Sequence, residues 1–560
     1  MSIDGRLIRD PGEVAEALNS HFYSRPHNIA SGIPESNEDF MNLVPVNPTY
    51  LYFSEVTPSE VHKFITYTHK NGNINDITLK FLKICIDNMS LILSEFFNLC
   101  FDSGIFPENL KISKITPVFK KGSRLDVGNY RPIAIVPNLG KIFECIIHSR
   151  LLNFFQSSNL LHENQFGFRK GKNTEMAALS LVEKVLPALE NKKYAICIFL
   201  DFTACFDTIN RNILFKKLNR YGVRGICLQF MKSYFEDRRQ SVCVGGSTSE
   251  TIEQEIGIIQ GSRLGPLLFD IYSNDLNELC TENENIIYAD DTCLVYSNDD
   301  LQLLTQIVNV KLDRIFNWCN YNKLSINPSK SEFLVVTHRS IGVEPSLAIS
   351  TDPILRKNAV RYLGLMVDDK LKFSNHIKNL KSRMSILCGI TYRLNDYLNL
   401  NAAKKMYFSF VYSVLSYCVV VWGGAITNSY VGRKLIERHG KIVRNLFRKF
   451  SNPNSCFFKS HKLLKLEDIH KFYAAIYMYK IIILRTSSII QQNELEYLNH
   501  EYNTRGRDQL ILPFPRVNAV RLNYKYQCVK VWNELPLEIR NSQRIGIFKK
   551  KVTDYFLNLY

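Results

Sequence analysis

Two adjacent aspartates and a third one upstream are the residues of this sequence whose types and spacing suit metal chemistry. Asp290 and Asp291 lie between two apolar runs, where a β-hairpin needs a tight turn, in the segment ENIIYADDTCLVYSND. Asp201 ends the apolar run KYAICIFLD, which is typical of a strand buried on both faces. If these strands are neighbours, three like charges share a small space and need a proton or a cation. Mg²⁺ prefers oxygen ligands, and two such ions can assist an in-line phosphoryl transfer, so the three carboxylates predict that chemistry.

The acidic pair also has an ordinary interpretation. Asp-Asp is a common turn sequence, because Asp tolerates turn geometry and caps backbone donors. Strands often end in Asp, so Asp201 is weak evidence when taken alone. The residues that flank the three acids, and their order along the chain, therefore have to decide between a turn and a site.

Composition and charge favour a nucleic-acid partner. The chain has 560 residues, enough for several domains, and its 46% hydrophobic content suits a packed globular protein. Lys and Arg total 70 against 53 acidic residues, a net charge of +17 that favours a polyanion. An acidic membrane surface could attract this charge too, but the sequence has no dense Lys/Arg block typical of lipid-binding tails. We therefore expect nucleic acid, and no membrane, as the partner.

The cysteines and the apolar runs indicate an intracellular protein. None of the 14 cysteines forms a close Cys-x-x-Cys pair, which argues against a zinc finger, and several lie in apolar runs as buried thiols do. The N-terminus carries charges where a signal peptide needs an apolar core. The longest apolar stretch, residues 410–426, is short for a membrane span, and we predict a buried helix there.

The elements that must position the acids form an α+β centre between mainly helical ends. Near the N-terminus, Asp10 and Thr57 are each followed by Pro and, three residues on, by Glu, which predicts two capped helices. Strands, basic glycine-containing loops and helices alternate from about residue 110, and helices dominate from Ser374 onward. The fold class is therefore α+β.

At least six segments, in the same order along the chain, resemble motifs of reverse transcriptases. The Tyr-x-Asp-Asp hairpin of that family resembles IIYADDTCLVY, and its first catalytic motif resembles FLDFTACFDTI. Its nucleotide-side loop and helix resemble GIIQGSRLGPLLFDIYSNDL. Its lysine-bearing motif resembles LSINPSKSEFLVV, and its primer-gripping hairpin resembles RYLGLMVDDKLKF. The fingers of non-LTR retrotransposon enzymes are similar to NYRPIAIVPNLGKIFECIIHSRL and NQFGFRKGKNTE, and the tail of jockey-like elements to VWNELPLEIRNSQRIGIFKKKV. The resemblance covers most of the chain and implies a jockey-like non-LTR reverse transcriptase.

This resemblance implies the roles of the residues around the acids. Asp201, Asp290 and Asp291 would be the catalytic metal ligands, and the backbone carbonyl of Phe202 would complete the shell of one ion. Phe206 matches the steric gate that excludes a ribonucleotide's 2′-hydroxyl, although it could equally be a core aromatic at a helix start. Asp207 is better interpreted as a helix cap than as a metal ligand.

Basic and glycine residues complete the implied nucleotide site. Arg131 and Arg169 could pair with triphosphate oxygens, or else contact the template backbone or solvent. Gln260 and Gly261 match the nucleotide-facing pair of the family, where glycine lets the backbone approach the substrate, unless it is a plain loop glycine. Lys330 could donate a proton to the pyrophosphate leaving group, or be a surface lysine. Arg263 departs from the small or apolar residue expected in this loop, and Gly364 would shape the primer-grip turn or merely a turn.

The resemblance implies a right-hand polymerase with fingers, palm and thumb, and helical extensions at both ends. We expect a helical N-terminal extension over 1–95, fingers and palm over 96–370, a helical thumb over 371–450, and a C-terminal region typical of mobile elements over 451–560.

The implied function is RNA-directed DNA synthesis by two-metal nucleotidyl transfer. The partners would be an RNA template, a DNA primer and deoxynucleoside triphosphates, and the cofactors two Mg²⁺ ions, with Mn²⁺ as a possible substitute. The sequence shows no second acidic and His cluster for DNA nicking, so we expect endonuclease activity to be missing from this chain. We expect the protein in nucleus and cytoplasm as a ribonucleoprotein.

Two alternatives remain open from the sequence. A catalytically inactive relic would keep the fold and bind nucleic acid through the +17 charge. An intron-type maturase would use its thumb in splicing, but no maturase segment is recognisable.

Overall fold

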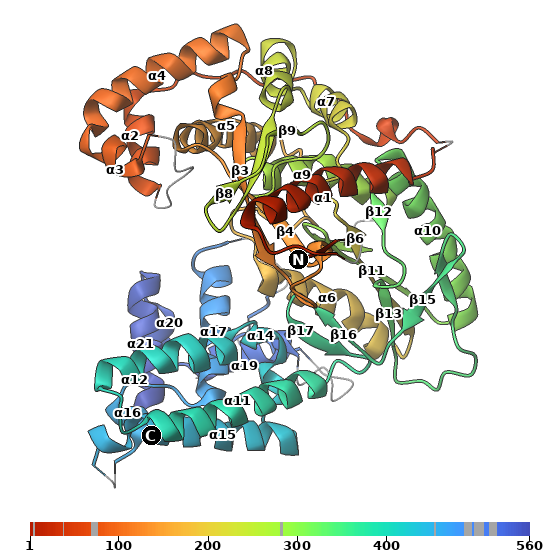
Figure 1. Cartoon of the computed structure of the whole chain (residues 1–560). Helices are drawn as coiled ribbons and strands as arrows, with labels where there is room; N and C mark the ends of the chain where they lie inside the picture. Colours follow the sequence, from red (N-terminus) through yellow and green to blue (C-terminus); the bar gives the residue numbers. More distant parts are fainter. Residues whose placement is uncertain are drawn as a thin grey trace.

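The computed structural model describes residues 1–3, 6–36, 38–68, 77–280, 284–452, 455–486, 495–497, 509–513 and 523–560 (Figure 1), and every structural statement concerns these residues. Two β-sheets form the centre, and helices surround them and make up both ends of the chain. The expected α+β class is confirmed.

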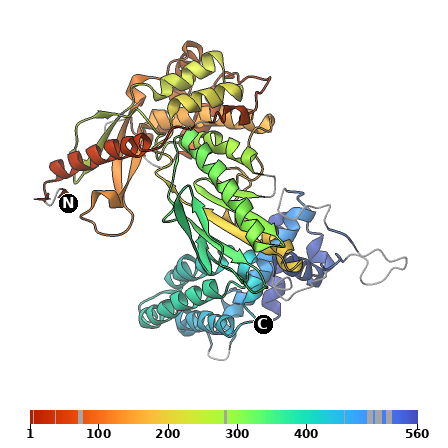
Figure 2. The same cartoon turned by 90° about the vertical axis from the view of Figure 1, so that its right-hand side faces the viewer.

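A six-stranded sheet forms the middle of the molecule. Its strand order is β10 (Asn285–Tyr288), β11 (Asp291–Asn298), β5 (Tyr194–Leu200), β13 (Glu332–Val336), β15 (Asp352–Arg356) and β14 (Leu347–Ile349). The central strand β5 is antiparallel to both of its neighbours, β11 and β13. Figure 2 shows this sheet between the N-terminal elements above and the C-terminal helices below.

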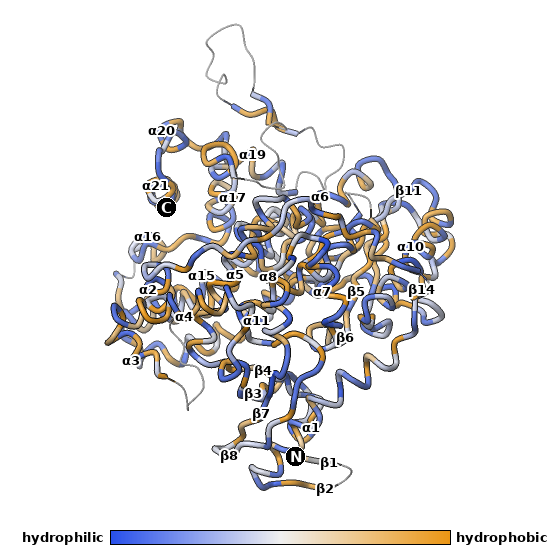
Figure 3. Tube along the Cα trace, turned by 90° about the horizontal axis from the view of Figure 1, so that it is seen from above, coloured by the Kyte–Doolittle hydropathy of each residue, from blue (hydrophilic) through white to orange (hydrophobic). Residues whose placement is uncertain are grey.

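Alternate residues of β5 enter two separate hydrophobic cores, as expected for a strand buried on both faces. Ile196 and Ile198 pack in the core that includes α10 (Leu301–Tyr321). Cys197 and Phe199 face the core of α6 (Thr174–Glu190) and the C-terminal helices. Hydrophilic and hydrophobic residues alternate along α10 (Figure 3), so one side of this helix packs on the sheet while the other meets water. This packing holds the end of β5, and the acid that follows it, in place.

A second sheet carries the basic segments predicted near residue 110. Its strands are β4 (Tyr130–Ile135), β3 (Ile112–Phe119), β7 (Arg239–Val244), β8 (Ser247–Thr248) and β9 (Ile252–Glu253). Helix α1 (Pro11–Ser31) lies against β7 and β8, and the Asn19 side chain donates to the Glu250 carbonyl at 2.8 Å. The other helices of this half are α2 (Pro58–Tyr67), α3 (Leu79–Ile84), α4 (Ile86–Ser103), α5 (Asn138–Ser157), α7 (Arg211–Arg220), α8 (Gly225–Phe235) and α9 (Gly265–Ser273).

Short strands and turns complete the central part. These are β1 (Ser2–Ile3) with β2 (Arg6–Leu7), β6 (Phe202–Thr203) with β12 (Ser325–Ile326), and the hairpin β16 (Ala359–Tyr362) with β17 (Leu365–Asp368). Both predicted N-caps are confirmed, since Asp10 accepts from the amide of Glu13 and Thr57 from that of Glu60.

The chain beyond Ser374 is helical, as predicted. Its helices are α11 (Ser374–Leu394), α12 (Leu400–Met406), α13 (Ser413–Ser416), α14 (Val419–Trp422), α15 (Tyr430–Phe447), α16 (Phe457–Ser460), α17 (Leu466–Ile482), α19 (Tyr524–Glu534), α20 (Leu537–Arg540) and α21 (Ile545–Asn558). The Tyr524 hydroxyl donates to Glu183 at 2.7 Å, which ties α19 to α6.

The predicted single buried helix over 410–426 is wrong. The run begins in a π-helical turn (Tyr407–Tyr412), continues as α13, and is broken before α14, where Cys418 has a φ of +48°. Residues after the break are buried, but Phe410 is exposed. Among the described residues, no single helix has the length and apolar character to cross a membrane; the pair Leu400–Ser416 and Val419–Ala425, bent by 53°, meets those two criteria only when taken together.

Candidate active site

The three aspartates lie together at one end of the strand pair β5 and β11. Asp201 directly follows β5, and the register of the pair sets Thr292 opposite Leu200. One position further along this antiparallel pair, Asp291 comes opposite Asp201. Asp290 precedes it in the hairpin turn. The structure therefore brings together the acids that the sequence placed 89 and 90 positions apart (290 − 201 and 291 − 201).

A two-residue turn presents Asp290. Tyr288 pairs with Asp291, so only Ala289 and Asp290 connect β10 to β11. Ala289 has a φ of +56°, in the left-handed region that tight hairpin turns require. The pair is thus split: Asp290 belongs to the turn, and Asp291 is the first residue of β11.

A neighbouring segment supports this turn through a contact that the sequence does not predict. The Gln165 side chain accepts from the amides of Gly167, at 2.9 Å, and Ala289, at 3.3 Å. A Cβ atom on Gly167 would lie 2.4 Å from the Ala289 nitrogen, so only glycine fits there. The segment NQFGFRKGKNTE resembles a fingers motif, but its contact with the acidic hairpin depends on tertiary packing.

The carboxylates perturb one another electrostatically. Partial burial, followed by the charges of Asp290 and Asp201, raises the pKa of Asp291 to about 6. Burial and Asp201 also raise the pKa of Asp290, while Arg131 and Lys120 act in the opposite direction. Both carboxylates are therefore protonated more easily than an exposed aspartate, and a cation bound here would compete with that proton.

Three basic side chains border the acids. The Lys330 ammonium lies 3.9 Å from Asp201 Oδ2, and 59% of its side chain is exposed. Burial lowers the pKa of Lys120, as do the nearby charges of Arg131 and Lys330, while Asp201 opposes them. Lys120 is not among the site residues that the resemblance implies, and the fold makes it a neighbour of Asp201. Such cations beside acids suit an anionic substrate that carries metal.

The donor set fits divalent metal held jointly with a substrate. Within the described residues, no group of three or more His, Cys, Asp and Glu side chains is arranged so that it could hold an ion by itself. Mg²⁺ is commonly held by one or two carboxylates, with substrate phosphates and water as its other ligands. The raised pKa values of Asp290 and Asp291 mark the charge that such an ion would offset.

A loop over residues 257–264, here called the Gln260 loop, runs beside the site. The Gln260 carbonyl accepts from the Ala134 amide of β4 at 2.7 Å. Gly261 has a φ of +111°, and a Cβ there would lie 2.5 Å from the Ala134 carbonyl oxygen. Glycine at this position thus fits the loop against β4, whereas the sequence suggested an approach to substrate.

Asp207 is not a helix cap, and that prediction is wrong. Helix α7 begins at Arg211, and the Asn210 side chain caps it. Asp207 instead accepts from Gln260 Nε2 at 2.7 Å. Burial raises the pKa of Asp207 to about 6, while the Gln260 hydrogen bond acts to lower it.

The positions of Phe206 and Phe202 are compatible with a site role and with a purely structural one. The Phe206 ring stacks on Phe269 of α9, with centroids 4.6 Å apart and planes 13° apart, while part of it stays exposed. No helix starts at Phe206. Phe202 lies in β6, next to Asp201, whose carbonyl accepts from the Asn327 amide at 2.7 Å. Gate and metal-ligand roles stay predictions.

Arg169 contacts residues other than the three aspartates of the site. Its guanidinium donates to the His162 carbonyl at 2.6 Å and lies 3.5 Å from Glu163 Oε1, and 12% of the side chain is exposed. A contact with triphosphate would require these partners to release it. Gly364, with a φ of +83°, and Leu363 form the tight turn between β16 and β17, so the predicted hairpin is present.

Comparison with known proteins gives one family for the centre of the chain. Residues 118–367 match the family described as reverse transcriptase (RNA-dependent DNA polymerase). The RNA-directed DNA polymerase from mobile element jockey of Drosophila melanogaster is 31% identical over 61% of this chain and 38% of the relative. The probable RNA-directed DNA polymerase from transposon BS of the same organism is 28% identical over 76% of this chain and 49% of its own length. The jockey protein of Drosophila funebris is 30% identical over 75% and 47%.

The chain spans less than half the length of these relatives. Among solved structures, telomerase from Candida albicans in complex with a telomeric RNA fragment aligns with a TM-score of 0.37 and 14% identity, over 62% of this chain and 66% of that one.

Proposed function

We propose, from the premise that residues 118–367 are a reverse transcriptase domain of the non-LTR retrotransposon type, that this chain extends a DNA primer on an RNA template. The observation that carries the proposal is the meeting of Asp201, Asp290 and Asp291 at one end of the central strands.

In this proposal the acids and the basic residues divide the work. Asp201, Asp290 and Asp291 would hold two Mg²⁺ ions, which Mn²⁺ could replace, and the Phe202 carbonyl would add a ligand. When bound, such ions favour the attack of the primer 3′-hydroxyl on the α-phosphorus and offset charge on the triphosphate.

The basic residues stabilise the leaving group. Lys120 and Arg131 bind the triphosphate oxygens from the β3 and β4 side, which their proximity to Asp201 and Asp290 supports. Lys330 gives a proton to the departing pyrophosphate, a role that its 3.9 Å distance from Asp201 supports.

The helical part of the chain would hold the nucleic acid. We propose the expected boundaries unchanged, with 96–370 as fingers and palm and 371–450 as thumb. Helix α15 supports a thumb that contacts phosphates, because it carries exposed Lys and Arg on one side and a buried apolar face on the other. Deoxynucleoside triphosphates would be the substrates.

Primer extension tests this proposal. Purified protein, a DNA primer on an RNA template and the four deoxynucleotides should give extended product with Mg²⁺, and EDTA should abolish it. Protein that binds the primer–template but gives no product with Mg²⁺ or Mn²⁺ would instead indicate the inactive relic.

The metal requirement should increase as the pH falls. Asp291 has a pKa of about 6, so a proton increasingly occupies this carboxylate below that pH and competes with the cation. Above pH 7 the carboxylate is free. We expect the Mg²⁺ concentration for half-maximal primer extension to be several-fold higher at pH 5.5 than at pH 7.5. Equal Mg²⁺ requirements at the two pH values would contradict this assignment.

Phe206→Val should relax the choice of sugar. The smaller side chain removes the ring that would meet a 2′-hydroxyl, so the ratio of ribonucleotide to deoxynucleotide incorporation should rise about tenfold to a hundredfold. The ratio is measured from kcat/KM for each nucleotide. Phe215→Val, in α7, is the matched control, because Phe215 packs edge-on against Phe235 and contributes no ring to the site. An unchanged ratio in Phe206→Val would identify Phe206 as a core aromatic only.

A further inference from the structure

Two acidic side chains that are not proposed metal ligands, Asp207 and Glu144, bind the Gln260 loop. We infer that Asp207 and Glu144 are positioning residues, which fix this loop from its two ends and thereby set the affinity for the incoming nucleotide. This inference rests on the proposed function, since the loop matters as a nucleotide contact.

Asp207 joins the proposed gate to the loop. Its carboxylate accepts from Gln260 Nε2 at 2.7 Å, and the Phe206 carbonyl beside it accepts from the Ile258 amide at 2.9 Å. A Cβ on Gly257 would lie 2.4 Å from the Asp207 carbonyl oxygen, so the two backbones are in close contact. The segment that carries Phe206 and the start of the loop therefore form one unit.

Glu144 holds the other end. This residue of α5 is 1% exposed, and its Oε2 accepts from the Arg263 amide at 2.8 Å. Its Oε1 accepts from the Tyr234 hydroxyl at 2.7 Å. Arg238, itself fully buried, offsets the charge of Glu144.

Burying a carboxylate costs free energy, so a buried glutamate such as Glu144 indicates a specific role for its two oxygens. Apolar residues of similar size usually stabilise a core at least as well as buried ionised groups do. What an apolar residue could not do is accept from the Arg263 amide and the Tyr234 hydroxyl together. Arg263 was the residue that departed from the family pattern, and the contact uses its backbone, so the side chain is free to differ.

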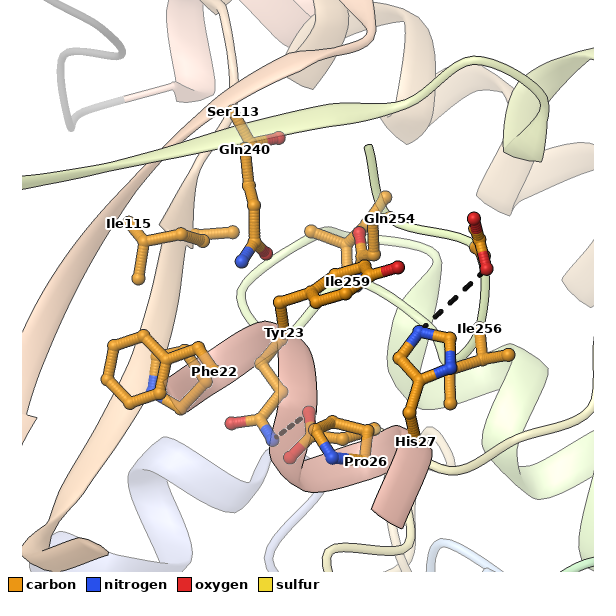
Figure 4. A pocket seen from close by; sticks show the side chains of 15 residues that line it. Phe22, Tyr23, Pro26, His27, Ser113, Ile115, Gln240, Gln254, Ile256 and Ile259 are labelled. Carbon is orange, nitrogen blue, oxygen red and sulfur yellow. Dashed lines mark hydrogen bonds and ion pairs between the residues drawn. The ribbon is translucent and has the colours of Figure 1, made fainter. Parts of the chain in front are cut away.

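Packing alone does not hold Gln260. A pocket lies between α1 and the loop, and Gln260 and Asp207 are among its lining residues. Figure 4 shows Tyr23, Pro26 and His27 of α1 at this pocket. Because the side chain of Gln260 borders open space, its direction depends on the hydrogen bond to Asp207.

The test combines hydrogen exchange with nucleotide kinetics. Glu144→Gln removes the charge and leaves one acceptor oxygen in place of two, so the Arg263 amide and the Tyr234 hydroxyl can no longer each donate to an oxygen of their own. We expect the amides of residues 258–263 to exchange at least about tenfold faster, and the KM for deoxynucleotide to rise about tenfold while kcat changes much less. Glu60→Gln is the matched control. Glu60 of α2 forms an ion pair at 2.7 Å with Arg150, which lies on α5 like Glu144 but away from the loop. This variant should change neither quantity.

A double-mutant cycle provides an independent readout for Asp207. Asp207→Ala and Gln260→Ala should each raise KM, and the double variant should be no worse than Gln260→Ala alone, because both remove one interaction. Additive effects, or unchanged exchange of the loop amides in folded Glu144→Gln protein, would overturn the inference. Hydrogen exchange decides this even if the wild-type chain makes no DNA, an outcome that would refute only the proposed polymerase.

Discussion

Asp290→Asn should reduce primer extension by about a thousandfold or more, since in the proposed function it removes a ligand of the metal ions that offset charge at the reacting phosphate. The substitution keeps the size of the side chain and the turn between β10 and β11. It also removes a like charge from beside Asp201 and Asp291, so the thermal midpoint should stay the same or rise. Primer–template affinity, measured by fluorescence anisotropy, should be nearly unchanged, because phosphate contacts elsewhere supply it.

This combination separates a lost catalytic group from a damaged fold. Asp299→Asn is the matched control: it makes the same change at the far end of the same strand, where Asp299 forms an exposed ion pair with Lys193 at 3.0 Å. That variant should extend primers normally. DNA synthesis retained by Asp290→Asn would refute the assignment of the acids.

Lys217→Met should lower the free energy of unfolding by about 3–5 kcal/mol, because it leaves a buried charge without its partner. The Lys217 ammonium donates to Asp275 Oδ1 and to the Tyr272 carbonyl, each at 2.6 Å, and neither charged side chain reaches solvent. Trp318 Nε1 donates to the other oxygen of Asp275 at 3.0 Å. The pair thereby ties α7 to the turn after α9 and to α10, all of which carry or support the site.

Urea denaturation followed by circular dichroism measures this loss. Lys434→Met removes one partner of the solvent-exposed pair with Glu437 and should cause no measurable change. A small effect of Lys217→Met, similar to that of the control, would mean that Asp275 finds another partner or takes up a proton.

The sequence alone determined the features that depend on local chemistry. The caps at Asp10 and Thr57, the continuous apolar run of β5 and the tight turn at Asp290 all follow from residues close together in the chain. The α+β class and the reverse transcriptase resemblance rested on such local patterns and their order, and both were confirmed.

Tertiary structure decided which distant residues meet. The sequence favours Asp207 as a helix cap, but the approach of the Gln260 loop makes it the hydrogen-bond acceptor of Gln260 instead. The apolar run over 410–426 suits one helix by composition, yet the helix breaks at Cys418, between α13 and the buried α14.

At the site, too, features that depend on neighbouring residues are predictable from the sequence, and contacts between distant residues are not. The residues next to Asp201 and Asp290 in the sequence predict that Asp201 ends a buried strand and that Asp290 occupies a turn. That Lys120, Gln165 and Glu144 should face this region is not predictable, because each comes from a separate element whose position is fixed only when the two cores pack. Local propensity sets the elements, and the burial of shared apolar surface sets their neighbours.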